Sequence, residues 1–185
     1  MVKLDKIYTR GGDEGQTSLG DGQRVQKNDL RVKTYGDFDE INAMLGITIC
    51  YCSDRIQNLL SVIQNDIFDL GADLCIPDNT KKNKLKVNLE QVLFLENNID
   101  KMNEDLEPLN SFILPGGSKA ASFLHLARCI TRRAERSLSE LNQNESVNKY
   151  IFQYINRLSD FLFVAARYEN MSRGDILWEP AKSQI

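Results

Sequence analysis

Residues 118–141 read SKAASFLHLARCITRRAERSLSEL, and this stretch decides the fold that the sequence predicts. Leu124, Leu138 and Leu141 recur at helical spacing on one side, together with several alanines, and Ser118 is a suitable N-cap. Small side chains let neighbouring helices approach closely, so this long amphipathic segment indicates a helical bundle.

Four further segments carry the same helical periodicity. We expect helices over about 37–52, starting near Asp37, over 56–74 before Pro77, over 92–106 before Pro108, and over 147–171. The lysine-rich segment 78–86 reads as a polar connection without a function, and no strand pattern competes with the helices. The fold class predicted is an all-α five-helix bundle in one domain, 1–185, with a loop segment 1–33, a bundle 34–171 and a tail 172–185.

Charge and composition exclude several classes of protein. The net charge is −3, which argues against binding to nucleic acid or a membrane surface through bulk electrostatics. The four cysteines show no Cys-x-x-Cys spacing and are expected to be free and mostly buried, as in a reducing cytosol. No apolar run is long enough to cross a bilayer. We expect a cytoplasmic protein that binds neither nucleic acid nor membrane.

A charged stripe runs along the predicted helix 118–141. His125, Arg128, Arg132 and Glu135 follow at spacings of three, four and three, which makes them neighbours on one face. One interpretation is a solvated face with an Arg/Glu pair. The other is a stripe held between packed elements, where arginines would grip phosphates or a partner carboxylate.

The N-terminal segment 8–22 reads YTRGGDEGQTSLGDG, with five glycines. Glycine backbone amides can approach an anion closely, so the segment reads as a phosphate-binding loop, although an ordinary flexible arm is the alternative.

Two other features allow two interpretations each. Asn156 and Asp160 interrupt an apolar helix, so they either join two helices or meet a ligand, and both interpretations place them inside. Phe112 precedes a Pro-Gly-Gly reversal and either fills the core or acts on a ligand.

Several chemistries are excluded. The chain has no Walker A sequence and no Gly-x-Gly-x-x-Gly motif after a strand. His125 is the single histidine, too few for a histidine-rich metal site, and no Ser-His-Asp or Cys-His set is readable. The pattern suits a reaction whose nucleophile comes with a cofactor.

Six blocks, in order, resemble the PduO-type ATP:cob(I)alamin adenosyltransferases. They cover the chain from Tyr8 to about Arg167: YTRGGDxGxTSL from Tyr8, RVxK from Arg24, YGxxDExN from Tyr35, FILPGG from Phe112, HxARxxxRRAER from His125, and NRLSD from Asn156.

The resemblance implies a homotrimeric bundle that binds ATP and a corrinoid between adjacent subunits. It would transfer the 5′-deoxyadenosyl group of ATP to the cobalt of cob(I)alamin and release triphosphate. Arg132 would hold phosphate charge, and Glu135 and Asn156 would position the nucleotide. No protein ligand is assigned to the Mg²⁺ of ATP. The residues implied to wrap the triphosphate are Thr9, Arg10, Gly11, Gly12, Asp13, Gly15, Gln16, Thr17 and Ser18, with Lys27.

The resemblance also implies a corrinoid side of the site. Phe112 would exclude the lower axial ligand of cobalt, giving a four-coordinate cobalt(II) that is easier to reduce, and Asp39 and Arg128 would pair across the subunit boundary. Glu14 departs from the family, in which many members carry Lys, and the tail 172–185 has no assigned role.

The alternative function is a non-catalytic helical binding or scaffold module that carries or delivers adenosylcobalamin. For the enzyme, a reductase and an adenosylcobalamin-dependent acceptor enzyme are the expected protein partners.

Overall fold

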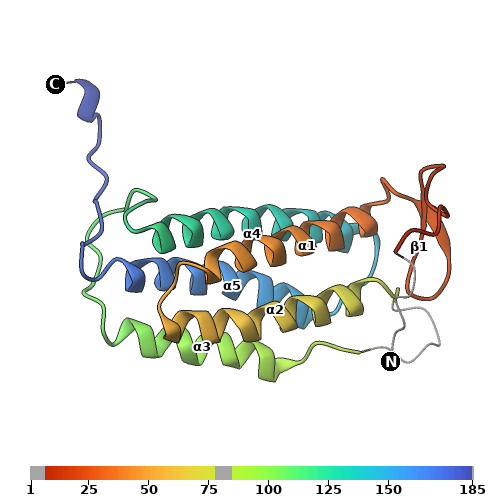
Figure 1. Cartoon of the computed structure of the whole chain (residues 1–185), viewed down its shortest axis with the longest axis horizontal. Coiled ribbons are helices and arrows are strands. Elements are labelled where there is room, and N and C mark those ends of the chain that lie inside the picture. The colour runs from red at the N-terminus through yellow and green to blue at the C-terminus, as the bar shows by residue number, and fades with distance from the viewer. Residues whose placement is uncertain (1–6, 78–84, 185) are drawn as a thin grey trace.

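The computed structural model describes residues 7–77 and 85–184 and confirms the helical fold. Five helices lie side by side in an elongated bundle (Figure 1). Their bounds are α1 Leu30–Ile49, α2 Asp54–Leu74, α3 Leu89–Asn103, α4 Lys119–Asn144 and α5 Lys149–Glu169. Most of the expected polar connection, 78–84, lies outside the described residues.

The long helix α4 lies at the centre of the packing. It contacts both α1 and α5, while α2 packs on α1 and α3 on α5. Ala121, Ala127 and Ala134 are fully buried in these contacts, as the small-residue face predicts. Ser118 caps the helix, because its Oγ accepts a hydrogen bond from Ala121 N at 3.0 Å.

The first helix begins seven residues earlier than predicted. Its N-cap is Asp29, which accepts from Arg31 N at 2.8 Å, and not Asp37. Arg31 and Thr34 are buried polar residues, so the apolar pattern that reveals the helix starts only at Phe38.

The expectation of no strands is wrong. Strands β1 (Gln16–Ser18) and β2 (Arg24–Gln26) pair antiparallel within the glycine-rich segment, with Thr17 opposite Val25. Three residues are too few to show the alternation by which a strand is recognised in sequence.

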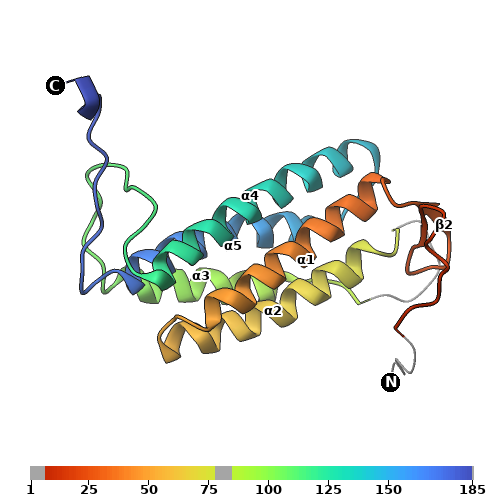
Figure 2. The same cartoon turned by 45° about the horizontal axis from the view of Figure 1, so that its top comes forward.

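Two irregular regions sit at opposite ends of the bundle (Figure 2). The β1–β2 hairpin lies at the end where α1 begins. The connection 104–118 and the C-terminal tail, with its short 3-10 helix η1 (Lys182–Gln184), lie at the other. None of the described helices is long and apolar enough to cross a membrane.

The cysteines differ from expectation in burial. All four are free thiols, but only Cys52 is buried; Cys75 is half-buried, and Cys50 and Cys129 are exposed. Cys50 lies at the C-cap of α1 and Cys129 on the solvent side of α4. Their apolar neighbours in sequence therefore led to a wrong prediction of burial.

Candidate functional site

The glycine-rich segment is an ordered hairpin held by its own polar contacts. Arg24 reaches across it, with Nη2 donating to Gly11 O at 2.6 Å and Nη1 donating to Ser18 Oγ at 3.3 Å. The backbone of Lys27 donates to Gly15 O at 2.8 Å. Arg10 and Gly15 take positive φ values, 59° and 81°, which turn the chain tightly.

Lys27 follows β2 and lies beside Gly12, in the glycine-rich turn that precedes β1. A methyl group added at Gly12 would lie 3.1 Å from Lys27 Nζ and 3.3 Å from the Gln16 carbonyl oxygen. The ammonium group and the glycine backbone therefore share one small space, an arrangement suited to an anion such as phosphate. The other residues expected around the triphosphate lie on the same hairpin or directly before it: Thr9, Asp13, Thr17 and Ser18.

The hairpin is attached to the bundle at a close backbone contact. Gly20 N donates to Cys75 O at 2.8 Å, just beyond the end of α2. A methyl group at Gly20 would lie 2.7 Å from Cys75 Sγ and from Ile76 Cγ1, so a larger residue there would have to displace these atoms.

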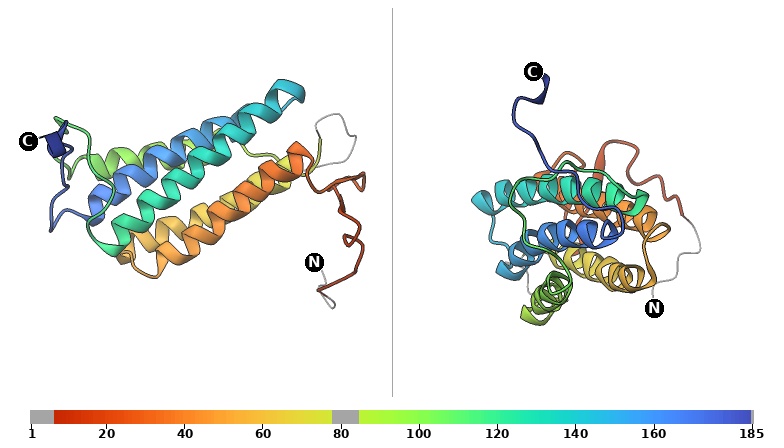
Figure 3. Two further views of the ribbon diagram at one scale, coloured as in Figure 1. Left: turned by 90° about the horizontal axis from the view of Figure 1, so that it is seen from above. Right: turned by 90° about the vertical axis from the view of Figure 1, so that its left-hand side faces the viewer.

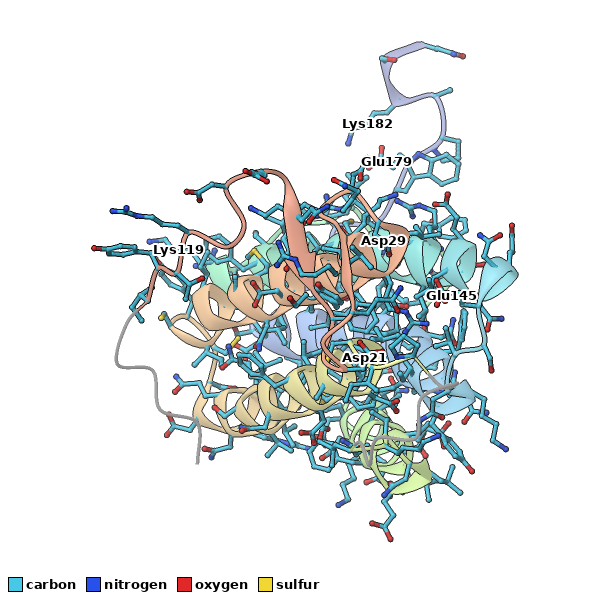
Figure 4. All side chains as sticks on the ribbon, turned by 90° about the vertical axis from the view of Figure 1, so that its right-hand side faces the viewer. Asp21, Asp29, Lys119, Glu145, Glu179 and Lys182 are labelled. Carbon is cyan, nitrogen blue, oxygen red and sulfur yellow. The ribbon has the colours of Figure 1, made fainter. Side chains whose placement is uncertain are left out.

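A buried arginine fixes the same end of the bundle. Arg31 Nη1 donates to Leu74 O at 2.6 Å, and its Nε and Nη2 donate to Glu145 Oε2 at 3.1 and 2.5 Å. Figure 4 views this end, with the cap Asp29 and Glu145 labelled on neighbouring helices. The contacts join α1, α2 and the end of α4 beneath the hairpin.

The charged stripe on α4 changes from buried to exposed along its length. His125 is buried, Arg128 is half-buried and Arg132 is exposed. The adjacent Arg133 forms an ion pair with Glu40 of α1, and that hydrogen bond raises the pKa of the guanidinium. Arg132 is thus a cation displayed on the surface, whereas His125 faces the inside.

Glu135 and Asn156, on neighbouring helices, are brought together in the structure. Asn156 Nδ2 donates to Glu135 Oε1 at 3.0 Å, joining α5 to α4. The prediction that Asn156 and Asp160 lie inside is wrong, since both are exposed. They occupy the solvent edge of α5, where Arg157 lies 3.5 Å from Asp160.

A cavity of about 520 Å³ opens beside Phe112, at the far end of the molecule. The Phe112 ring is 77% exposed, which rules out the core-filling interpretation. His125, Arg128 and Phe163 form much of the inner wall. This space combines aromatic surface with polar nitrogens, as a site for a large, partly polar ligand requires.

His125 is an unusual member of that wall. It is 2% exposed, and neither ring nitrogen has a hydrogen-bond partner among the described residues. Burial, reinforced by the nearby Arg128 charge and opposed by Asp175, lowers the pKa of the imidazole, which favours the neutral form. The Arg128 Nε atom is likewise buried without a partner in the described parts of the chain.

Asp39 lies elsewhere, in a groove between α1 and α2. This groove has a volume of about 430 Å³ and is lined mainly by apolar or aromatic residues, including Tyr35, Phe38 and Phe68. Phe68 is 69% exposed. No ion pair between described residues joins Asp39 to Arg128, so one chain alone does not form the expected pair.

The tail after α5, which had no assigned role, contributes to the Phe112 region. Ile113 forms an antiparallel bridge with Leu177, and the rings of Phe112 and Trp178 meet edge to face at 6.2 Å. Trp178 is the single tryptophan of the chain. Its presence in the tail could have marked this segment as functional, but helical periodicity does not detect a residue outside a helix.

One chain therefore keeps the two halves of the expected site apart. The hairpin with Lys27 and the Phe112 cavity lie at opposite ends of the bundle (Figure 1). The 26-residue helix α4 runs between these ends and is about 39 Å long, at 1.5 Å per residue. No ligand could touch Lys27 and Phe112 of the same chain.

Comparison with known proteins identifies related sequences. Residues 7–169 match the family described as cobalamin adenosyltransferase. The corrinoid adenosyltransferase of Bacillus subtilis is 45% identical over 175 residues, 91% of this chain and 89% of the relative. The corrinoid adenosyltransferase PduO of Salmonella typhimurium is 45% identical over 97% of this chain, which spans 54% of that longer relative.

Solved structures show the same fold. An F112A variant of the PduO-type ATP:corrinoid adenosyltransferase from Lactobacillus reuteri, complexed with cobalamin and ATP, is 41% identical. It superimposes with a TM-score of 0.91 over 94% of this chain and 99% of its own. An R132K variant complexed with ATP gives a TM-score of 0.87 over 94% of this chain and 100% of its own.

Proposed function

The chain belongs to the cobalamin adenosyltransferase family, and from this we infer that it transfers the 5′-deoxyadenosyl group of ATP to the cobalt of a corrinoid. It is an ATP:corrinoid adenosyltransferase. The observation that carries this conclusion is likeness over nearly the whole chain, which includes the hairpin, the α4 stripe and the Phe112 segment together.

We assign the triphosphate to the hairpin. Lys27 Nζ, the positive-φ turn and the backbone amides between Thr9 and Ser18 form its cationic and donor groups. Arg132 adds an exposed guanidinium, and the Glu135–Asn156 pair offers a carboxylate and an amide to the nucleotide. Mg²⁺ would enter as part of the ATP complex.

The reaction needs charge stabilisation more than acid–base chemistry. Cobalt(I) supplies the electron pair that forms the Co–C bond to the ribose 5′ carbon. The C–O bond to the triphosphate breaks, and its electron pair leaves on that group. Fixed cations such as Lys27 and Arg132 at the leaving group lower the barrier, while the protein holds the two reactants in line.

We assign the corrinoid to the cavity beside Phe112. Its exposed ring can contact a flat macrocycle and exclude the lower axial ligand of cobalt. His125 and Arg128 have buried nitrogens without partners among the described residues, and these can bind the polar groups at the edge of a corrinoid. These contacts favour four-coordinate cobalt(II), which is easier to reduce.

The two half-sites require a second copy of the chain. Because Lys27 and Phe112 lie at opposite ends of one bundle, we propose that neighbouring subunits of a homotrimer each supply one half. The apolar α1–α2 groove that contains Asp39 and the exposed Phe68 would face the partner, where Asp39 would meet the partner's Arg128.

The direct test mixes the purified protein with ATP, Mg²⁺ and chemically reduced cob(I)alamin. The absorption spectrum should convert to that of adenosylcobalamin, with one triphosphate released per turnover. The alternative function, a carrier that binds adenosylcobalamin without making it, would show binding of the product and no conversion. A reductase upstream, an acceptor enzyme downstream and a cytoplasmic location complete the proposal.

A further inference from the structure

The chain after α5 turns back and pairs with the segment that carries Phe112. Leu114 N donates to Ile176 O at 2.8 Å, and Trp178 N donates to Phe112 O at 2.7 Å. We call residues 111–114 together with 175–178 the clasp. It lies at the end of the bundle that faces the viewer in the right panel of Figure 3.

Packing alone does not hold the Phe112 ring. Its 77% exposure leaves little contact with the core, and its ring meets Trp178, which is itself 47% exposed. The position of the ring is therefore set by its backbone, which is hydrogen-bonded to the tail at the Phe112 carbonyl and the Leu114 amide.

Asn170, the C-cap of α5, ties the clasp to the bundle. It is 3% exposed. Its Oδ1 accepts from Ser118 N at 2.9 Å, and its Nδ2 donates to Gly116 O at 3.0 Å and to Asp175 Oδ1 at 3.2 Å. One side-chain amide thus contacts both the turn between Phe112 and α4 and the first residue of the tail segment that pairs with Phe112.

Two further features make this junction rigid. Gly117 has a φ of +102°, and a methyl group there would lie 2.5 Å from Asn170 Nδ2, so glycine is required both for its conformation and for space. Asp175 is held from its other side by Arg167 Nε at 3.0 Å, in an ion pair whose side chains are 11% and 12% exposed.

We propose that Asn170 is a positioning residue for adenosyl transfer, acting through the clasp to fix the Phe112 ring against the corrinoid. This inference rests on the proposed function of Phe112. Asn170 lies beneath the Pro-Gly-Gly turn, so its effect passes through the backbone rather than through contact with either substrate.

The test compares Asn170→Ala with a matched control at the other end of the same helix. Asn148, the N-cap of α5, is also an amide hub: its Nδ2 donates to Asp73 Oδ2 at 2.7 Å and to Val87 O at 2.8 Å. Asn148→Ala removes a comparable set of hydrogen bonds far from the clasp, so it reports the purely structural cost of losing such a residue.

Five quantities are measured on both variants, with activity assayed from cob(II)alamin and a reductant: kcat, the KM for ATP, tryptophan quenching, the cob(II)alamin spectrum and the thermal midpoint. For Asn170→Ala we expect kcat to fall at least about tenfold, because a small displacement of a positioning group has a large effect on rate. The KM for ATP should change less than about twofold, since the hairpin is untouched. The single tryptophan, Trp178, should become more accessible to a neutral quencher. The bound corrinoid should lose the spectral signature of four-coordinate cob(II)alamin. Asn148→Ala should lower the thermal midpoint alone.

Equal behaviour of the two variants in kcat, spectrum and quenching would overturn the proposal. If Asn170→Ala does not fold, Asp175→Ala decides, because it frees the tail from Asn170 and Arg167 and leaves the Gly116 and Ser118 contacts in place. A wild-type rate and spectrum in that variant would also overturn it. A wild-type protein without any adenosyl transfer would instead refute the proposed function, so the two failures are distinguishable.

Discussion

His125 is a buried side chain that no structural need explains. An unsatisfied polar group in the interior costs free energy, and an apolar residue of similar size would avoid that cost. Both ring nitrogens lie without partners among the described residues, at the wall of the Phe112 cavity. A buried polar group that is kept at a cost in stability is typical of a binding site.

A first prediction concerns the pH dependence of stability. The folded-state pKa of His125 is lowered from the ordinary 6.5, by burial first and then by Arg128, with Asp175 opposing. Below about pH 6.5 the unfolded chain binds a proton that the folded chain resists, so the free energy of unfolding should fall as pH falls towards the folded pKa. Chemical denaturation of His125→Leu should show a flatter decrease over this range, and an unchanged slope would assign the pH dependence to other groups.

A second prediction concerns Arg132. Because its guanidinium is exposed, Arg132→Ala should leave the thermal midpoint nearly unchanged. If it stabilises the leaving triphosphate, kcat/KM should fall by about 10²-fold or more. Arg55→Ala, which removes an exposed arginine of α2, serves as the control for loss of surface charge. An Arg132→Ala variant that retains more than half the parental kcat/KM would contradict the phosphate role.

A third prediction concerns Phe112. Since the ring is 77% exposed, Phe112→Ala should change stability by less than about 1 kcal/mol and keep ATP affinity. The four-coordinate cob(II)alamin spectrum should disappear, and the rate deficit should shrink when cobalt is supplied as cobalt(I). A large drop in thermal midpoint with an unchanged spectrum would show that the ring supports the fold instead.

At the scale of elements, the helices are joined at one end by Arg31. This buried guanidinium ties the start of α1 to the last carbonyl of α2, at Leu74, and to Glu145 beyond α4. The same junction supports the attachment of the hairpin at Gly20, so local stability and the shape of the phosphate loop are linked there.

A fourth prediction tests that junction. Arg31→Ala leaves the Leu74 carbonyl without its donor and should lower the free energy of unfolding by about 3 kcal/mol, as breaking a buried charged contact does. Glu145→Gln should cost less, about 1 kcal/mol, because Glu145 is 42% exposed and keeps an acceptor. Urea denaturation measures both, and equal losses would mean that the ion pair, not the Leu74 contact, dominates.

Helical periodicity predicted four of the five helices closely and missed the start of the first. It succeeds where the buried positions of a helix are apolar. In the first turns of α1 the buried residues Arg31 and Thr34 are polar, so the pattern is absent there. The burial of Asn156 was mispredicted because its neighbours in sequence are mostly apolar, although Asn156 itself lies on the exposed face of α5. The clasp could not be predicted at all: its pairing joins segments more than sixty residues apart through backbone groups, which carry no sequence signature.

At the scale of the whole molecule, the two half-sites lie at the two ends of a bundle. Lys27 and the hairpin belong to one end, and Phe112 with Arg128 to the other. In the proposed homotrimer, a head-to-tail arrangement of identical copies would bring these unlike ends together and close into a ring.

A fifth prediction follows from this arrangement. Lys27→Ala and Arg128→Ala damage different halves, so each variant alone should be nearly inactive. When they are unfolded and refolded together in equal amounts, about one interface in four should combine two intact halves and regain activity. Refolding each variant alone is the control. Light scattering should show trimers throughout, and an active monomer, or no recovery on mixing, would refute the shared site.

The separation of hairpin and clasp also has a genetic consequence. In the proposed trimer, a chain with a damaged hairpin would inactivate only the site to which its hairpin contributes, and its clasp would still serve an intact neighbour. In a cell that makes equal amounts of intact and hairpin-damaged chains, about half of the sites remain complete in randomly assembled trimers. Activity should therefore fall in proportion to the dose of intact chain, and such alleles should behave as recessive. An allele whose chain enters trimers and disrupts the whole assembly should instead be dominant.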